Sequence, residues 1–165
     1  TYDVDAELFY DFWQFDVNPT DADNIYAATV RGSGFEVPGI YATWDGGVSG
    51  DHLYTPAEGG WMDPAFFGDP YAFALKIAPS NPSRVVITGD RVDLTDDGGD
   101  TWIQKYTDAV GNAWKGRGIE LMNTDGIAFD PQNAQSYYIG YDDMGLFRTD
   151  DGGESYTRLD PKQDP

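Results

Sequence analysis

Short apolar runs separated by turn-forming residues recur along this chain at a nearly constant interval. In each repeat, a strand ends, the chain turns at proline, asparagine, aspartate or serine, and a strand rich in β-branched or aromatic residues follows. This segment occurs at residues 17–27, 77–87 and 127–139. A third short strand is predicted at 39–42, 92–94 and 145–148. A fourth strand is clearest at 102–106 and 155–159. No stretch of about ten residues or more has the apolar spacing of a helix, so the sequence predicts an all-β chain.

A further repeated segment of eight residues lies between the third and fourth strand of each unit. Its copies occupy residues 43–50, 95–102 and 149–156. The periods between the shared aspartates are 97 − 45 = 52 and 151 − 97 = 54 residues, which indicates one supersecondary unit written three times. Each copy contains Asp-Gly-Gly, where glycine reaches positive φ in a tight turn and aspartate accepts N–H groups of that turn. We therefore predict structural roles for Asp45, Asp97 and Asp151.

Four strands per period is the size of a β-propeller blade. The predicted fold is therefore all-β, with three four-stranded antiparallel blades at about 10–60, 70–110 and 120–162, all parts of one propeller over residues 1–165. Propellers usually close with about four to eight blades, so three blades predict an incomplete propeller. Further blades are expected from a longer polypeptide or from other subunits, and the first source is favoured.

The charge balance excludes two classes of partner. The chain has 29 acidic and 10 basic residues and a formal net charge of −19, so it would repel nucleic acid and anionic membrane surfaces. No apolar run approaches the ~20 residues that span a bilayer. The chain contains no cysteine and begins at Thr1, from which we expect that a leader or an upstream region has been removed. The acidic, aromatic-rich composition is typical of a secreted, extracellular protein.

The eight-residue segments carry a family resemblance. Residues 95–102 and 149–156 resemble the Asp-box (BNR) pattern, Ser/Thr-x-Asp-x-Gly-x-Thr-Trp/Phe, whereas the first copy has Gly50 in place of the aromatic residue. A narrower stretch, from Gly118 through Pro131 to residues 143–151, resembles xyloglucanase-type glycoside hydrolases. This resemblance implies that Asp143, with Asp142 as the alternative, is one of two catalytic carboxylates. The second carboxylate has no counterpart in this chain.

The topology of a four-stranded meander gives an independent indication of where function lies. Its first and third turns emerge at one end of the blade, so the Asp boxes are expected beside the turns at Pro19, Pro79 and Pro131. Binding usually depends on variable loops at one end of a rigid scaffold. At the opposite end we expect the connections 30–38, 88–91 and 141–145, with the links 51–71 and 108–125.

Several residues of this second end are candidates for sugar binding. Trp61, Trp114 and Tyr141 could stack on sugar rings, while Arg117 and Glu120 could bind hydroxyl groups. The alternatives are that the aromatic rings cover neighbouring blade ends and that Arg117 and Glu120 pair with each other. Glycoside hydrolysis needs one carboxylic acid to protonate the leaving oxygen and a second carboxylate as base or nucleophile.

The sequence predicts no cofactor. Residues 93–98 resemble the start of an EF-hand loop, but Gln104 replaces the bidentate glutamate at the twelfth position, which excludes that motif. A structural calcium ion in another acidic loop remains an alternative. His52 is the single histidine, so a His-rich zinc site is excluded and a solvated loop position is expected. The leading hypothesis is a secreted Asp-box propeller that binds and hydrolyses a xyloglucan- or β-glucan-like polysaccharide. The alternative is a non-catalytic extracellular binding or assembly module.

Overall fold

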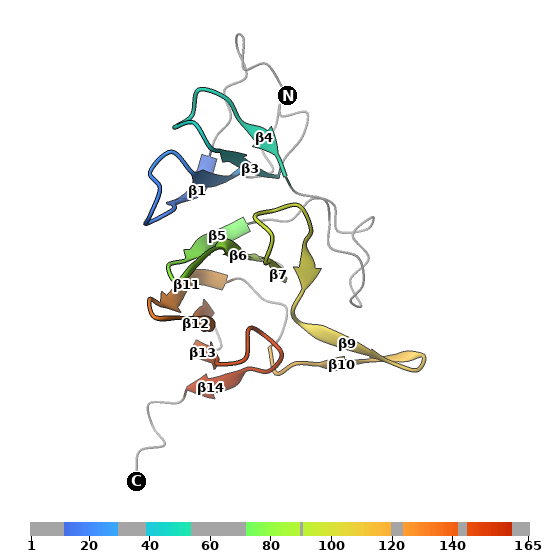
Figure 1. Cartoon of the computed structure of the whole chain (residues 1–165). Coiled ribbons are helices and arrows are strands. Elements are labelled where there is room, and N and C mark those ends of the chain that lie inside the picture. Colours follow the sequence, from blue (N-terminus) through green and yellow to red (C-terminus); the bar gives the residue numbers. More distant parts are fainter. Residues whose placement is uncertain are drawn as a thin grey trace.

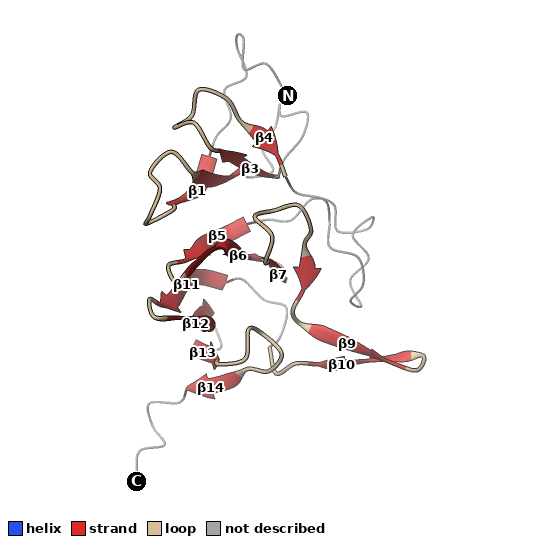
Figure 2. Ribbon diagram, viewed as in Figure 1, coloured by secondary structure: helices blue, strands red, loops and turns tan. Residues whose placement is uncertain are grey.

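The structure, a computed structural model, describes residues 12–29, 39–53, 72–89, 91–119, 124–141 and 145–159. All regular structure in these residues is β-strand (Figure 2). The strands form three four-stranded sheets and one two-stranded hairpin, each with antiparallel pairing. In the part of the chain so described, no helix has the length and apolar character to cross a membrane.

Each four-stranded sheet is a meander in which consecutive strands lie side by side. Blade 1 comprises β1 (Phe12–Val17), β2 (Ile25–Thr29), β3 (Ile40–Thr43) and β4 (Asp51–His52). Blade 2 comprises β5 (Ala72–Ala78), β6 (Asn81–Gly89), β7 (Val92–Thr95) and β8 (Ile103–Gln104). Blade 3 comprises β11 (Thr124–Asp130), β12 (Asn133–Tyr141), β13 (Gly145–Thr149) and β14 (Thr157–Leu159). The predicted fold of three four-stranded antiparallel units is confirmed.

The three blades are arranged in chain order, with blade 2 between the other two (Figure 1). Their first strands are neighbours, because β1 contacts β5 and β5 contacts β11. First strands that follow one another around a common axis are typical of a propeller. The three sheets are therefore consecutive blades of a propeller.

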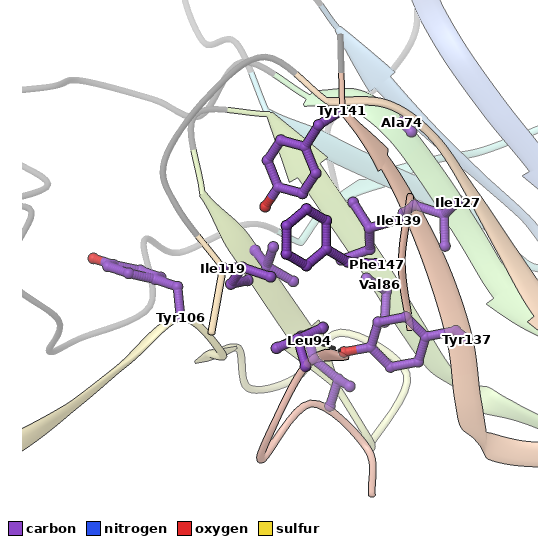
Figure 3. Packing of buried hydrophobic residues seen from close by; sticks show 12 residues of the cluster. Ala74, Val86, Leu94, Tyr106, Ile119, Ile127, Tyr137, Ile139, Tyr141 and Phe147 are labelled. Carbon is purple, nitrogen blue, oxygen red and sulfur yellow. Dashed lines mark hydrogen bonds between the residues drawn. The ribbon is translucent and has the colours of Figure 1, made fainter. Parts of the chain in front are cut away.

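The side chains between the blades form two separate apolar cores. The first core joins blades 1 and 2, and its largest members are Tyr26, Ile40, Leu75, Ile87 and Trp102. The second core joins blades 2 and 3, where Leu94, Tyr137, Ile139 and Phe147 pack together (Figure 3). Successive side chains of a strand point to opposite faces. Strand β6 consequently supplies Val85 and Ile87 to the first core and Val86 to the second.

The segment after β8 differs from the expected fourth strand and loop. The strand predicted at 102–106 is limited to Ile103–Gln104, because Trp102 and Tyr106 turn their rings into the two different cores. The link predicted at 108–125 contains a hairpin of β9 (Thr107–Val110) and β10 (Ala113–Gly116). This hairpin projects away from the blades (Figure 1).

The three eight-residue Asp-Gly-Gly segments, which we call Asp boxes after the pattern they resemble, lie beside the first turn of their own blade, as predicted. In every blade, the first glycine of the box donates its backbone N–H to a backbone carbonyl in or just after the first turn. The three bonds are Gly46 to Asp23 (3.0 Å), Gly98 to Ser83 (2.9 Å) and Gly152 to Gln135 (2.9 Å). The first turn and the Asp box of a blade are thereby held at one end, whereas its second strand ends and its third strand begins at the other.

Candidate functional site

The Asp-box carboxylates accept hydrogen bonds from their own loops. In the second box, Thr95 Oγ1 donates to Asp97 Oδ1 at 2.7 Å, and Thr101 N donates to the same oxygen at 2.9 Å. Thr101 Oγ1 donates to Asp97 Oδ2 at 2.5 Å. The same three bonds recur around Asp45 and Asp151, with a serine in place of the second threonine. The repeated sequence therefore produces a repeated hydrogen-bond network.

These bonds hold the box carboxyls in the ionised form. The hydroxyl and amide of Thr101 lower the pKa of Asp97 to about 2. Burial raises the pKa of Asp151, but hydrogen bonds from Ser155 and Thr149 outweigh it and lower the pKa to about 2. The hydroxyl and amide of Ser49 likewise lower the pKa of Asp45. A general acid needs a pKa near the working pH, so this geometry supports a structural role for all three boxes.

The second and third boxes are also fastened to residues that precede their own blade. Tyr26 of blade 1 donates its hydroxyl to the Gly98 carbonyl at 2.9 Å. Arg117 Nη1 donates to the Gly153 carbonyl at 3.2 Å. The box end of the molecule is therefore a set of interlocked turns, and a ligand-binding surface is better sought at the opposite end.

At that opposite end, two strands of blade 3 flank in sequence the strongest candidates for catalysis. Strand β12 ends at Tyr141 and β13 begins at Gly145, which has φ +86°. The candidate carboxylates Asp142 and Asp143 occur between these positions in the sequence and lie outside the described residues. The candidates Glu120 and Trp61, and the connections 30–38 and 54–71, also lie outside them.

Two buried polar pairs support this end of the blades. Thr124 Oγ1 donates to Thr88 Oγ1 at 2.6 Å across the junction between blades 2 and 3. Arg91 Nε donates to Asp93 Oδ2 at 2.8 Å, and both side chains are almost fully buried. A buried charge is costly unless it is paired, so this ion pair fixes the start of β7. The sequence analysis missed it, although two residues separated by one along a strand share a face.

Tyr141 belongs to the apolar core. Its ring meets the edge of Phe147 at a centroid distance of 5.3 Å, and Figure 3 shows it beside Phe147, Ile139 and Ile119. The alternation of Tyr137, Ile139 and Tyr141 places all three on the face toward blade 2. The structure thus gives Tyr141 a packing role beneath the end of blade 3.

Arg117 and Trp114 have different surroundings, which give them different roles. Arg117 Nη2 donates to Asp108 Oδ1 at 2.6 Å, and Arg117 Nη1 lies 3.2 Å from Glu154 Oε2. The hydrogen bond from Arg117 lowers the pKa of Asp108. These contacts tie the β9–β10 hairpin to the third Asp box, so this part of the 108–125 link lies beside a box and not at the opposite end expected for it. Trp114 instead lies on β10 with 46% of its surface exposed, so its ring is accessible to a ligand.

Among the residues that the structure describes, no three acidic or histidine side chains converge as metal ligands would. A structural calcium ion therefore stays an untested expectation. His52 lies in β4 instead of the loop expected for it, with its ring 4.9 Å from that of Tyr41 in an edge-on arrangement. This histidine packs on the outer face of blade 1.

Comparison with known proteins supports the fold. No protein-family model and no curated protein matches the sequence. Solved structures match well: an ancestral GH74 enzyme has 16% identity and a TM-score of 0.62, covering 96% of this chain and 20% of that chain. The GH74 xyloglucanase from Xanthomonas campestris has 16% identity and a TM-score of 0.61, covering 92% and 24%. YCF48 bound to a D1 peptide has 15% identity and a TM-score of 0.60, covering 92% and 42%.

The chain thus spans less than half of each of these proteins. At such identities the likeness concerns the arrangement of strands. The three sheets have the fold of consecutive blades in a β-propeller.

Proposed function

We propose that this chain is part of a secreted propeller that binds a xyloglucan- or β-glucan-like polysaccharide at the blade ends opposite the Asp boxes. The observation that carries the proposal is that all three box carboxylates are hydrogen-bonded within their own turns, which supports a structural role for them and directs the search for ligand chemistry to the other end. The solved GH74 xyloglucanase of the same fold supports this choice of substrate class. A neutral polysaccharide is also compatible with a net charge of −19, because it is not repelled.

We propose further that the intact protein hydrolyses this polysaccharide, with Asp143 as one acid/base carboxylate and Asp142 as the alternative. The proposal rests on the place of these residues in the sequence, between the end of β12 and the start of β13. Hydrolysis requires a second carboxylate, which another part of the intact protein would supply.

The test of catalysis is a pair of substitutions with the same change of charge. In the intact protein, Asp143→Asn should lower turnover of xyloglucan by about 10²-fold or more, since general acid–base catalysis contributes about 10²–10⁴-fold. Asp142→Asn is the matched control and should retain most of the turnover. A loss with Asp142→Asn alone would transfer the role to Asp142. Full turnover in both variants would refute the hydrolase.

A second, separate binding surface is tested on the two faces of the β9–β10 hairpin, because this hairpin is tied to the third Asp box and exposes Trp114. Trp114 pairs with Ala109 and Val110 pairs with Ala113, so Trp114 and Val110 project from opposite faces. Trp114→Ala should weaken binding of xyloglucan oligosaccharides by about 5- to 10-fold, measured by titration calorimetry, because aromatic stacking contributes about 1 kcal/mol. Val110→Ala should bind like the unmodified chain. Equal affinities of all three proteins would refute a role for Trp114.

A second function, as a non-catalytic extracellular binding or assembly module, is favoured by one observation. Blades 1 and 3 expose apolar side chains such as Phe15 and Leu146. One structural neighbour, YCF48, is described as bound to a peptide, which is compatible with a protein ligand. Unchanged turnover in Asp143→Asn together with retained ligand binding would favour this function over hydrolysis.

A further inference from the structure

Two buried hydroxyl groups join blades 2 and 3 at the end opposite the Asp boxes. Thr124 Oγ1 donates to Thr88 Oγ1 at 2.6 Å, and these side chains are 2% and 1% exposed. We call this contact the hydroxyl bridge. By strand pairing, the positions equivalent to Thr88 and Thr124 at the junction of blades 1 and 2 carry Ala28 and Ala72. The hydroxyl bridge therefore belongs to one junction and is not a feature of the repeat.

A pair of glycines beside the hydroxyl bridge leaves the end of β12 with little side-chain packing. Gly126 of β11 pairs with Gly140 of β12, whereas the equivalent pair in blade 2 is Ala74 with a threonine. Glycine weakens the interior of a strand because it has no side chain to pack. The pair that follows toward the strand end, Thr124 with Tyr141, therefore depends on other contacts.

Two side-chain contacts hold this last pair of β11 and β12. The ring of Tyr141 meets the edge of Phe147 at a centroid distance of 5.3 Å. On the neighbouring strand, Thr124 is joined to blade 2 by the hydroxyl bridge. Asp142 and Asp143 follow Tyr141 directly in the sequence. The hydroxyl bridge therefore acts on the strand end from which both candidate carboxylates extend.

The blade 2 side of the hydroxyl bridge is anchored within its own blade. Thr88 pairs with Val92, which lies between the two members of the buried Arg91–Asp93 ion pair. The Gly89 amide donates to the Arg91 carbonyl at 3.1 Å and closes the connection that follows Thr88. Breaking a buried ion pair is strongly destabilising. Thr88 therefore provides a fixed support for the strand end of blade 3.

We propose that the hydroxyl bridge positions the acid/base carboxylate, a role that rests on the proposed hydrolase. The bridge fixes the Thr124–Tyr141 end of blade 3 against blade 2, and Asp143 follows that end in the sequence. Thr88 and Thr124 are positioning residues, because their burial keeps them from touching a polysaccharide. Misplacing a reacting group by about 1 Å can cost about 10²-fold in rate. Loss of the bridge should therefore lower kcat and leave KM unchanged.

Valine at both positions removes the hydroxyl bridge and keeps the shape of the two side chains. In the intact protein, Thr124→Val alone leaves the Thr88 hydroxyl without this partner, so it should lower the urea midpoint. Replacing both partners by apolar groups of the same shape is nearly neutral, so the double variant Thr88→Val, Thr124→Val should unfold near the midpoint of the unmodified protein. It should still turn over xyloglucan about 10-fold more slowly, at an unchanged KM. Full kcat in the folded double variant would overturn the proposal.

Two single substitutions separate the hydroxyl group from the packing around it. Thr124→Ser keeps the hydroxyl and should retain most of the kcat. Thr107→Val removes a hydroxyl that is equally buried but has no hydrogen-bond partner among the described residues, so kcat should not change. A fall of kcat in either variant as large as in the double variant would assign the effect to packing and overturn the bridge. If the valine pair does not fold, alanine at both positions, as at the first junction, replaces it.

Hydrogen exchange of backbone amides gives a readout that needs no substrate. The end of β12 around Tyr141 should exchange about 10-fold faster in the double variant, because the bridge no longer opposes local opening. The equivalent strand end of blade 1, around Ala28, should exchange at an unchanged rate. Unchanged exchange around Tyr141 would overturn the bridge. An unmodified protein that turns over no xyloglucan would refute the hydrolase, and faster exchange in its double variant would still show that the bridge fixes this strand end.

Discussion

Replacing Asp97 by asparagine removes one charge from the middle Asp box and keeps a side chain of nearly the same shape. The carboxylate accepts three hydrogen bonds from Thr95 and Thr101, and bonds from Thr101 lower its pKa from 3.8 to about 2. At 1.36 kcal/mol per pKa unit, this difference corresponds to about 2.5 kcal/mol. Because the group is exposed, solvent screening reduces the expected loss to about 1 kcal/mol.

The same reasoning fixes the direction of the pH dependence. The folded-state pKa of Asp97 lies below the ordinary value. The ionised carboxylate therefore contributes its full share to the free energy of unfolding above about pH 4, and this share is lost as the pH falls through about 2. Asp97→Asn should therefore be less stable than the unmodified chain at pH 7 by about 1 kcal/mol. The difference in free energy of unfolding between the two proteins should shrink toward pH 2.

Urea unfolding followed by tryptophan fluorescence measures this difference, since Trp102 is buried in the same blade. Asp100→Asn is the matched control, because Asp100 is exposed in the same loop and loses the same charge. Its free energy of unfolding should change by less than about 0.5 kcal/mol. Equal losses in the two variants, or a constant difference from pH 7 to pH 2, would show that the hydrogen-bonded carboxylate does not stabilise the blade.

Three further substitutions probe the junctions. Gly153→Ala should lower the free energy of unfolding by about 2 kcal/mol more than Gly47→Ala. The backbone strain is alike, with φ +91° at Gly153 and +93° at Gly47, but only at Gly153 would the new methyl group stand 2.5 Å from the Tyr137 hydroxyl. Equal losses of stability in urea unfolding would contradict this reasoning. Tyr26→Phe should cost about 1 kcal/mol by thermal unfolding, because a carbonyl loses its donor; an unchanged midpoint would argue against that bond. Arg117→Lys should speed cleavage of the 107–116 hairpin by proteinase K, since lysine lacks the guanidinium fork; an unchanged rate would show that the hairpin is held otherwise.

The blades could be predicted from the sequence because their determinants are local. Asp-Gly-Gly specifies its turn within a few residues, and the flanking strands carry apolar residues at regular spacing. The burial of Tyr141 was also encoded locally, in the alternation with Tyr137 and Ile139. Its aromatic side chain next to a loop favoured a ligand-binding role in the sequence analysis, whereas the neighbouring blade buries its ring.

The partners of Arg117 could not be predicted in this way. Asp108 and Glu154 are 9 and 37 residues away in sequence, and only the path of the β9–β10 hairpin brings them together. That hairpin turns at a Gly111–Asn112 pair, with Gly111 at φ +62°, and its short strands lack a marked apolar alternation. Contacts between blades depend on tertiary geometry, so a pattern within one segment carries no information about them.

In both hydrogen bonds that fasten an Asp box to an earlier part of the chain, the donor residue precedes the box in sequence. Tyr26 precedes the box it binds, at Gly98, and Arg117 precedes the box it binds, at Gly153. A ribosome releases the N-terminal part of a chain first, and folding begins there during synthesis. The boxes of blades 2 and 3 are therefore synthesised after the residues that bind them, so these two blades can dock in the order in which they are translated.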